Sequence, residues 1–541
     1  MPSFNYDFPY STKKLPIFAS NVVASSQHLA ATAGLRMMAK GGNAVDAAIA
    51  SAIAITVVEP TMNGIGADAF CILWDGKKLV GLNASGHSPE LMTPDQYKGQ
   101  DKMPNVGWGS VTTPGAVSLW MELHKRYGKL PFADLFEPGI KYAHDGFRVS
   151  YMVARQWDRA IDRLKGQESW VKAFLPNGRA PQPGELWKFP DQARTLTKIA
   201  ESKGEAFYRG ELAEAMDKYA RETGGALRKE DLAAHKPDWV DPIGLSYRGT
   251  TLHEIPPSGQ GIAACMALGI LENFDVAGHD PDGPEMTHLR IEAMKLAFAD
   301  IYRYVADPRF MEVTPKQMLD KGYLKSRAKL IDPRKAKDFG PGTPKDGGTI
   351  YLGTADEQGM MVSLIQSNYT GFGSGIVVPG TGIALQNRAT GFVTTKGHAN
   401  EVGPKKRPFH TIIPAFITKD GRPVATFGLM GGAMQPQGHA QIVMNLIDFG
   451  MNLQEAGDAP RIQHDGSTEP AGQNTPMSDG GTLNLESQFP YASVQALMRK
   501  GHRIEYADGP YGGYQAIARD PDTGMYIGAT ESRKDGQAAG Y

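Results

Sequence analysis

The sequence predicts a mixed α/β (α+β) fold in which buried helices pack against β-sheets. Residues 43–56 form an Ala-rich, almost wholly apolar stretch, which is typical of a helix buried on all sides. Residues 69–74 and 79–82 favour two strands joined by a polar turn at 75–78. Residues 349–355 and 361–367 form a second pair of β-favouring segments. Helices and antiparallel hairpins therefore share one chain.

Length and charge limit the classes of function. The chain has 541 residues, enough for three or four domains, although large α/β cores often form one unit. Its formal net charge is -1 and its pI is about 6.9. This balance excludes the strong positive field that nucleic-acid or membrane-surface binding requires, so small molecules are the expected partners.

Cysteine usage and the N-terminal residues bear on the compartment. The two cysteines, Cys71 and Cys265, stand in apolar surroundings and are expected to be buried small hydrophobic residues rather than a disulfide framework. The first 18 residues lack the uninterrupted apolar core of a signal peptide. The longest apolar stretch, residues 44–58, is too short to cross a bilayer. We expect a cytoplasmic protein.

Apolar periodicity and turn residues predict the remaining elements. The helices are expected at 25–39, 114–127, 133–144, 153–165, 191–203, 286–305 and 437–448. Ser25 or Ser26 is the expected N-cap of the helix at 25–39. The later strands are expected at 376–378, 382–385, 411–417 and 424–429. The stretch 325–348 has no periodicity and predicts a mobile linker.

Thr349 stands where this linker meets a strand, which suits a nucleophile released by self-cleavage. Its hydroxyl can attack the carbonyl carbon of Gly348, which has no side chain to block the approach. Hydrolysis of the resulting ester would leave Thr349 as a new N-terminus. A free α-amine has a pKa of about 7.7 to 8.0, so it can act as the base for the neighbouring hydroxyl. The expected parts are a large fragment, 1–348, and a small catalytic fragment, 349–541.

The strand pair after Thr349 leaves two registers open. A five-residue connection, 356–360, places Ser367 opposite Thr349, where its hydroxyl can bond to that of the nucleophile. A four-residue connection places Gln366 there instead. An ordinary surface hairpin after a loop is the alternative that needs no chemistry at all.

A glycine pair supplies the second catalytic feature. Gly431 and Gly432 end a predicted strand and precede a predicted helix. Two backbone N–H groups near a helix N-terminus are suited to stabilise an oxyanion. A plain strand-to-helix turn is the competing interpretation and is compatible with that role.

Collinear motifs from about residue 20 to the C-terminus resemble the γ-glutamyltransferase family of N-terminal-nucleophile hydrolases. They include GGNAVDAAIA at 41–50, PPSGQGI at 256–262, the segment from Thr349 to Gly375, Gly431-Gly432 and APRIQHDG at 459–466. The resemblance implies a four-layer αββα sandwich made of two autoproteolytic fragments. It also implies Thr349 as nucleophile, Ser367 as its hydroxyl partner, and the amides of Gly431 and Gly432 as oxyanion hole.

The residues that bind the γ-glutamyl amino acid in the family are altered in this chain. By position they correspond to Ser85, Tyr369, Arg388, Gly391, His410 and Thr411. Ser85 replaces an arginine that holds the α-carboxylate, and His87 is the nearest candidate cation, although a loop histidine without a role is an equal alternative. Gly391 cannot pair with an ammonium group, whereas Arg388 and His410 bring positive charge. The pattern is similar to the divergent branch of cephalosporin-acylase-like and oxamate-hydrolase-like proteins.

Two classes of function compete. The first is a self-processing amidohydrolase or acyltransferase that forms an acyl-enzyme and passes it to water or an amine. It would act on an acid-bearing small-molecule amide, with γ-glutamyl transfer and glutathione metabolism as the family default. The second is an uncleaved, inactive relative used as a binding protein. No metal or cofactor, nucleic acid or membrane is expected, and a dimer of heterodimers is one allowed assembly.

Overall fold

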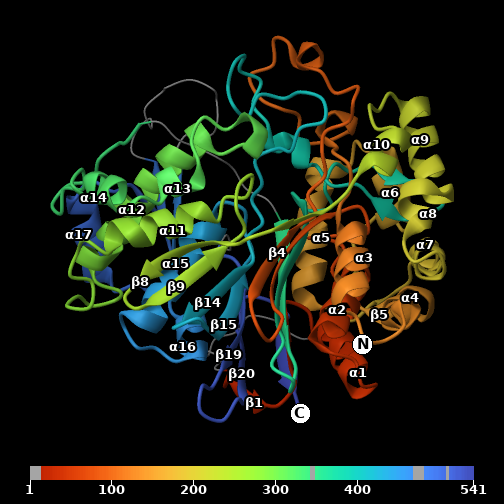
Figure 1. Cartoon of the computed structure of the whole chain (residues 1–541). Helices are drawn as coiled ribbons and strands as arrows, with labels where there is room; N and C mark the ends of the chain where they lie inside the picture. Colours follow the sequence, from red (N-terminus) through yellow and green to blue (C-terminus); the bar gives the residue numbers. More distant parts are fainter. Residues whose placement is uncertain (1–13, 341–347, 467–480, 507–510) are drawn as a thin grey trace.

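The structure is a computed structural model that describes residues 14–340, 348–466, 481–506 and 511–541. Two seven-stranded antiparallel sheets lie face to face at its centre, and helices cover both outer sides (Figure 1). We name each sheet by one central strand. The β10 sheet carries the expected nucleophile, and the β15 sheet carries the glycine pair.

Each sheet is built from both halves of the chain. The order in the β10 sheet is β21 (Gln537–Gly540), β2 (Val22–Ser25), β10 (Gly348–Ala355), β11 (Met361–Tyr369), β3 (Asp68–Trp74), β4 (Leu79–Asn83) and β7 (Asp238–Val240). The order in the β15 sheet is β1 (Ile17–Ala19), β20 (Tyr526–Thr530), β19 (Tyr514–Arg519), β15 (Arg422–Leu429), β14 (Ala415–Lys419), β9 (Thr250–Glu254) and β8 (Ile243–Tyr247).

Helices from different parts of the chain cover the two sheets. Those sharing a core with the β10 sheet are α1 (His28–Ala39), α2 (Ala44–Val58), α3 (Ala116–Tyr127), α4 (Glu137–Asp145), α5 (Tyr151–Leu164), α6 (Glu168–Phe174), α7 (Pro190–Glu201), α8 (Glu205–Arg209), α9 (Glu211–Thr223) and α10 (Lys229–Ala234). Those sharing a core with the β15 sheet are α11 (Ile262–Leu271), α12 (Pro284–Tyr304), α13 (Pro315–Met318), α14 (Lys321–Ala328), α15 (Met434–Ile447) and α16 (Leu453–Asp458).

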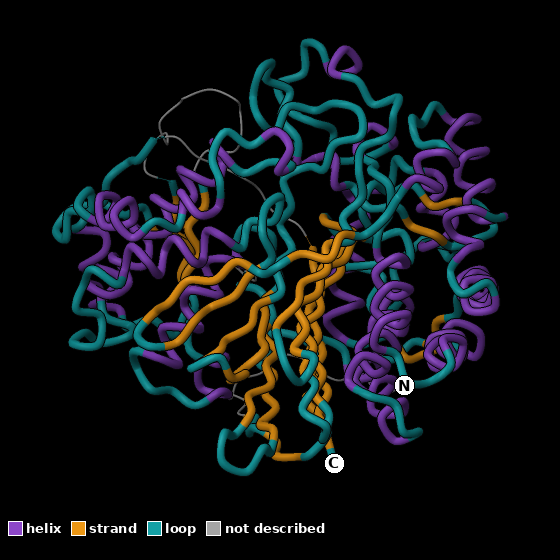
Figure 2. Tube along the Cα trace, viewed as in Figure 1, coloured by secondary structure: helices purple, strands orange, loops and turns teal. Residues whose placement is uncertain are grey.

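A third apolar core lies between the two sheets and completes the layers. Its members come from facing strands and include Phe70, Tyr351, Ile365, Phe416 and Ile517. Helix, sheet, sheet and helix therefore follow one another across the molecule, as the tube view also shows (Figure 2). The αββα sandwich that the family resemblance implies is confirmed.

Smaller elements complete the fold. Two-stranded sheets pair β5 (Phe147–Arg148) with β6 (Leu186–Trp187) and β12 (Val377–Val378) with β13 (Ile383–Ala384). A three-stranded sheet joins β16 (Ile462–Asp465), β17 (Thr482–Leu485) and β18 (Ile504–Glu505), beside helix α17 (Tyr491–Arg499). Across the described ranges, no helix combines the length and apolar character that a bilayer crossing requires. Cys71 and Cys265 are free and buried, as predicted.

The first two helices show how local sequence determines the elements near the site. Every residue of α2 is buried, and Asn43 and Asp46 form a capping box at its N-terminus. Helix α1 begins later than predicted because Ser25 belongs to strand β2. Its N-cap is Gln27, whose side-chain oxygen accepts the N–H groups of Leu29 and Ala30.

The stretch for which the sequence predicted a mobile linker begins with regular structure. Helix α14 extends to Ala328, and the backbone after it is held by side chains of α12. His288 Nε2 donates to the carbonyl oxygen of Asp332, and the amide of Lys337 donates to Glu292. The part of the predicted linker at 341–347 lies outside the described residues.

Candidate active site

Thr349 lies at the start of β10, where the pairing with β11 shifts by one residue. Ala355 pairs with Met361 and Ile350 pairs with Gln366, so the connection is the five-residue one, 356–360. Gly348 pairs with Tyr369, which places a bulge between Gly348 and Ile350. Ser367 and Asn368 therefore both oppose the backbone of Thr349. The register with Gln366 opposite Thr349 does not occur.

Tyr351 connects β10, the strand of the expected nucleophile, to β15, which precedes the glycine pair. Its hydroxyl lies 2.8 Å from Thr426 Oγ1 on β15 and 3.2 Å from Ser363 Oγ on β11. Its ring packs on Gly428 so closely that a Cβ atom there would meet the ring at 2.4 Å. Tyr351 is two residues beyond Thr349, and Gly428 is three residues before Gly431. This contact therefore brings the end of β15 close to the beginning of β10.

The glycine pair forms a sharp turn between β15 and α15. Gly431 has φ of 117° and Gly432 has φ of 59°, which favour residues without a side chain. Their carbonyl oxygens accept the amides of Met434 and Gln435 and so begin the helix. Successive N–H groups in such a turn form a concave anion site beside the positive end of the helix. This turn is compatible with an oxyanion hole, and that role of Gly431 and Gly432 stays a prediction.

Gln260, which precedes Thr349 in the chain, fixes this turn. Its Nε2 donates to the carbonyl oxygen of Gly432 at 2.8 Å and to that of Thr411 at 2.6 Å. Its backbone amide donates to the carbonyl oxygen of His410 at 2.9 Å. Through these bonds Gln260 holds the backbone of His410 and Thr411 against the loop before α11. The strand predicted at 411–417 therefore begins only at Ala415. Gln260 was not predicted as a site residue, although it lies within the PPSGQGI motif.

Asp68 lies at the centre of the altered substrate positions. It is fully buried opposite Ser367 in the sheet. Its Oδ1 accepts the amides of Gly86 and Gly115, and its Oδ2 lies 3.3 Å from His410 Nε2. Burial raises the pKa of Asp68 to about 7, although Arg388 and the two amides oppose this. Asp68 was not predicted, and its only sequence signal is a carboxylate at the first residue of β3, directly after a glycine-rich turn.

His410 is a neutral hydrogen-bond donor rather than a cation. Burial, together with the charges of Arg388 and Arg407, holds the pKa of His410 well below its usual value. Its Nδ1 accepts the amide of Ile412, so the proton lies on Nε2 and faces Asp68. The prediction that both Arg388 and His410 bring positive charge is therefore wrong for His410, because the buried ring loses its proton.

Arg388 supplies the charge at these positions. It begins a short 3₁₀ turn, Arg388–Gly391, and is 1% exposed. Its Nη1 donates to Thr411 Oγ1 at 2.8 Å, and its Cζ lies 4.8 Å from the centre of the Tyr369 ring. Burial lowers the pKa of Arg388 to about 10, so the guanidinium stays protonated at neutral pH. Tyr369, Arg388 and Thr411 therefore lie together, and their role in binding a substrate stays a prediction.

The positions that would hold an α-amino acid are closed. A Cβ atom at residue 391 would lie 2.3 Å from the carbonyl oxygen of Phe409, so no side chain fits there. Asn400 holds this contact by donating to the carbonyl of Gly391 and accepting the amide of Phe409. Ser85 turns away to bond Asn83, with its Oγ 2.7 Å from Asn83 Oδ1. Neither a carboxylate for the ammonium group nor an arginine for the carboxylate is present at these positions.

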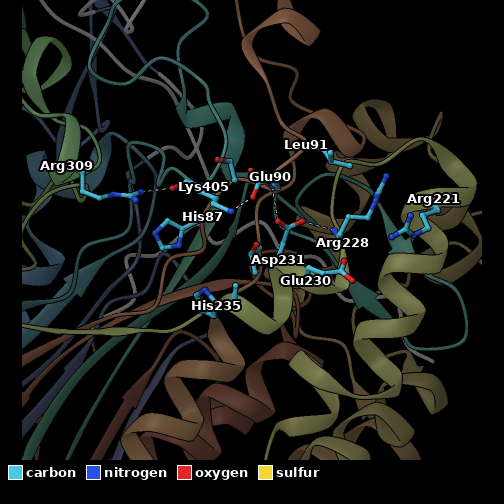
Figure 3. Close-up of a pocket in the computed structure, with 13 residues that line it drawn as sticks. His87, Glu90, Leu91, Arg221, Arg228, Glu230, Asp231, His235, Arg309 and Lys405 are labelled. Atoms are coloured by element: carbon cyan, nitrogen blue, oxygen red, sulfur yellow. Dashed lines mark hydrogen bonds and ion pairs between the residues drawn. The ribbon is translucent and has the colours of Figure 1, made fainter.

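His87 does not replace the missing arginine. Burial and the charges of Arg407 and Arg309 lower the pKa of His87 to about 4, so it is uncharged at neutral pH. It lines a cavity of about 630 Å³ together with His235, Asp231 and Arg309 (Figure 3). The prediction of His87 as the nearest cation is therefore wrong.

Asn368 is a third polar residue near the site that was not predicted. It is fully buried at the bulge opposite Thr349, and neither its Nδ2 nor its Oδ1 has a partner among the described residues. A buried amide without partners is costly, and such groups often face a ligand. Its neighbour Ser367 accepts the amide of Tyr369 at 2.8 Å.

His288, Glu292 and His502 form one close group of metal-ligand residue types in the described part of the chain. His288 Nδ1 lies 2.8 Å from His502 Nε2, and Glu292 pairs with Lys295. These groups satisfy one another with hydrogen bonds and anchor residues 332–337. Their role in the fold is evident, and the absence of a catalytic metal stays a prediction.

Comparison with known proteins identifies the family. The model of the gamma-glutamyltranspeptidase family matches residues 30–541. The glutathione hydrolase-like YwrD proenzyme of Bacillus subtilis is 34% identical over 97% of this chain and 99% of its own length. The oxamate amidohydrolase proenzyme of Klebsiella pneumoniae is 35% identical over 96% of this chain and 98% of its own length.

Solved structures agree with this result. The crystal structure of a cephalosporin acylase from Bacillus halodurans has a TM-score of 0.93 and 47% sequence identity, and the match covers 100% of this chain and 99% of that one. The match therefore includes both sheets and both helical layers. The fold, the family model and the relatives together show that this chain is an enzyme of the gamma-glutamyltranspeptidase family.

Proposed function

We propose that the chain is a self-processing threonine amidohydrolase whose substrates are amides with a carboxylate on the acyl part. It first breaks its own bond between Gly348 and Thr349. Thr349 Oγ then attacks the amide carbon of the substrate, and the freed α-amine takes the hydroxyl proton and passes it to the leaving amine. Gly431 and Gly432 stabilise the oxyanion. Water attacks the resulting ester and releases the acid and free Thr349.

The closed position at Gly391 is the observation that carries the choice of substrate. In a γ-glutamyl-specific site an acidic side chain has to reach the α-ammonium group. Here the carbonyl oxygen of Phe409 occupies the place of any such side chain. Arg388 supplies a buried charge for an acid group of the substrate, with Thr411 holding the guanidinium. An acyl group with a carboxylate but no amino group therefore fits these residues better than a γ-glutamyl group.

The names of the relatives support two versions of this activity. An oxamate amidohydrolase and a cephalosporin acylase both favour hydrolysis of non-γ-glutamyl amides. A glutathione hydrolase-like proenzyme favours the family default, γ-glutamyl hydrolysis or transfer, as the second candidate. All of these would pass through the same ester at Thr349.

Two chromogenic anilides separate these candidates. Glutaryl p-nitroanilide and γ-glutamyl p-nitroanilide differ by the α-amino group alone. We expect kcat/KM to be at least about tenfold higher for the glutaryl compound. A preference for the γ-glutamyl compound would refute the proposed substrate and favour the family default.

A denaturing gel tests the processing step. The purified protein should give two bands, one about two-thirds and one about one-third of the full-length mass, and the smaller should begin with Thr349. A single full-length band, with no turnover, would favour a binding protein instead. A cytoplasmic location and a dimer of such heterodimers stay predictions that fractionation and sedimentation can address.

A further inference from the structure

The guanidinium of Arg388 is buried with one edge unsatisfied. Its Nε and Nη2 have no hydrogen-bond partner among the described residues, although the side chain is 1% exposed. The third nitrogen, Nη1, donates a hydrogen bond to Thr411 Oγ1. Leaving a buried charged donor unpaired is unfavourable, so such a group points to a ligand that completes it.

The two unsatisfied nitrogens belong to the same side of the guanidinium. Nε–H and one N–H of Nη2 point in one direction and match the two oxygens of a carboxylate. Thr411 holds the other end and therefore orients this fork. A lysine at the same place would present a point charge without the two parallel donors. The ligand class that fits is a carboxylate.

Tyr369 covers the face of the same guanidinium. The ring centre lies 4.8 Å from Arg388 Cζ, and the tyrosine is 4% exposed. Its φ of 79° is a left-handed conformation that bulky residues seldom adopt, and such outliers persist only where the surroundings enforce them. Here the backbone of Tyr369 pairs with Gly348, and its amide donates to Ser367 Oγ.

Gly348 is the residue that would become a chain end in the proposed processing step. Once the bond to Thr349 is broken, Gly348 is no longer part of a continuous strand. Its pairing with Tyr369 can then be lost. The left-handed residue can then relax and its ring can leave the guanidinium. Cleavage would release the nucleophile and open the carboxylate site in one event.

We infer that Arg388 is the residue that binds the acyl carboxylate, and that Tyr369 covers it until the bond between Gly348 and Thr349 is cut. This inference rests on the proposed function and adds a link between processing and substrate binding. The uncleaved chain would then have a closed site as well as a blocked nucleophile.

Calorimetric titration with glutarate tests the cover. Three proteins are compared: the processed enzyme, the uncleaved Thr349→Ala chain, and the uncleaved Thr349→Ala/Tyr369→Gly chain. Glycine tolerates the left-handed backbone and removes the ring. We expect the uncleaved chain to bind glutarate at least about tenfold more weakly than the processed enzyme, and the double variant to regain most of that affinity. Equal affinity in the first two proteins would overturn the cover.

Arg388→Lys in the processed enzyme tests the bidentate binding of a carboxylate by Nε and Nη2. The variant keeps the charge, so weaker glutarate binding by at least about tenfold with an unchanged unfolding temperature supports the bidentate edge. Unchanged affinity, or equal binding of neutral glutaramide by the wild type, would overturn the carboxylate assignment. Asp420→Gly in the uncleaved chain is the matched control for Tyr369→Gly, because it also removes a side chain from a left-handed position, here an exposed one. It should leave the affinity for glutarate unchanged.

Failure of the proposed function and failure of the Tyr369 cover give different results. If no cleavage occurs between Gly348 and Thr349, the proposed function is wrong. If the enzyme is cleaved and hydrolyses the glutaryl anilide while the uncleaved chain binds glutarate equally well, the cover alone is wrong.

Discussion

The buried carboxyl group of Asp68 holds three separate segments of the chain together. It holds the loop of Gly86, the turn at Gly115 and the ring of His410, each through a separate hydrogen bond. These bonds fix the loop that carries Ser85 relative to residues 410 and 411. Because the carboxyl group is fully buried, its ionisation is coupled to the stability of the whole region.

Replacing Asp68 with Asn should flatten the dependence of stability on pH. The folded-state pKa of Asp68 is raised to about 7 from an ordinary value of 3.8, so the folded chain holds a proton that the unfolded chain has released. The stability from this group is therefore present below pH 3.8 and is lost as pH rises through 7. We expect the wild type to lose roughly 2–4 kcal/mol of unfolding free energy relative to Asp68→Asn over that window.

Unfolding midpoints of both proteins between pH 4 and 8 measure this difference. The exposed Asp420→Asn variant is the control and should follow the wild-type profile. Parallel profiles for wild type and Asp68→Asn would mean that Asp68 is ionised throughout.

Gln260 is predicted to act on the chemical step without touching the substrate. Gln260→Met keeps the volume but leaves the carbonyls of Gly432 and Thr411 without their donor. The glycine turn should shift, so we expect kcat to fall by about tenfold to a hundredfold with KM changed less. Gln192→Met removes a buried donor to Gly382 and is the matched control, which should lower stability alone. An equal loss of kcat in both variants would argue against a positioning role.

At the scale of elements, the hairpin of β10 and β11 is tied to helix α2. Asp356 accepts the amide of Ala44 at 2.7 Å with one oxygen. With the other it accepts the amides of Gln358 and Met360, both at 3.1 Å. One side chain therefore shapes the turn and satisfies the first amide of the helix. This explains why the strand that carries Thr349 has a fixed register.

Asp356→Ala should destabilise the fold because it leaves the buried amide of Ala44 and the partly buried amides of Gln358 and Met360 without acceptors. We expect a loss of about 1–3 kcal/mol, measured by urea unfolding of the uncleaved Thr349→Ala chain, which is a single molecule. Asp520→Ala is the control, because Asp520 accepts the amides of Asp522 and Thr523 in an exposed hairpin turn. A similar loss in both variants would mean that burial of the Asp356 contacts does not matter.

At the scale of the whole molecule, the two expected fragments are interleaved rather than joined side by side. In the β10 sheet, strands β10 and β11 of the small fragment lie between β2 and β3 of the large one. In the β15 sheet, β1 and the pair β9–β8 of the large fragment form both edges. Separating the fragments would break ladders in both sheets and expose the core between them.

We therefore expect the cleaved protein to behave as one particle. Size-exclusion chromatography under native conditions should give a mass of 58.5 kDa or a whole multiple of it. The two fragments should separate only in denaturant, because main-chain ladders and an apolar core do not dissociate in dilute buffer. Elution of the small fragment by itself under native conditions would contradict the interleaved arrangement.

The sequence by itself determined the mixed fold, the buried helix α2, the hairpin after Thr349 and the glycine turn at 431–432. These follow from local rules: apolar periodicity, turn residues and the freedom of glycine. It left open whether Ser367 or Gln366 lies opposite Thr349, because register depends on the whole ladder.

Only the tertiary structure decided which polar groups are charged and which are satisfied. His410 was expected to bring positive charge and His87 was a candidate cation, but burial and nearby arginines lower the pKa of both and leave them neutral. Asp68 and Gln260 became visible as organising residues when distant loops were brought around them. Desolvation and hydrogen bonding are set by neighbours that lie far away in the chain, and no local pattern reports them.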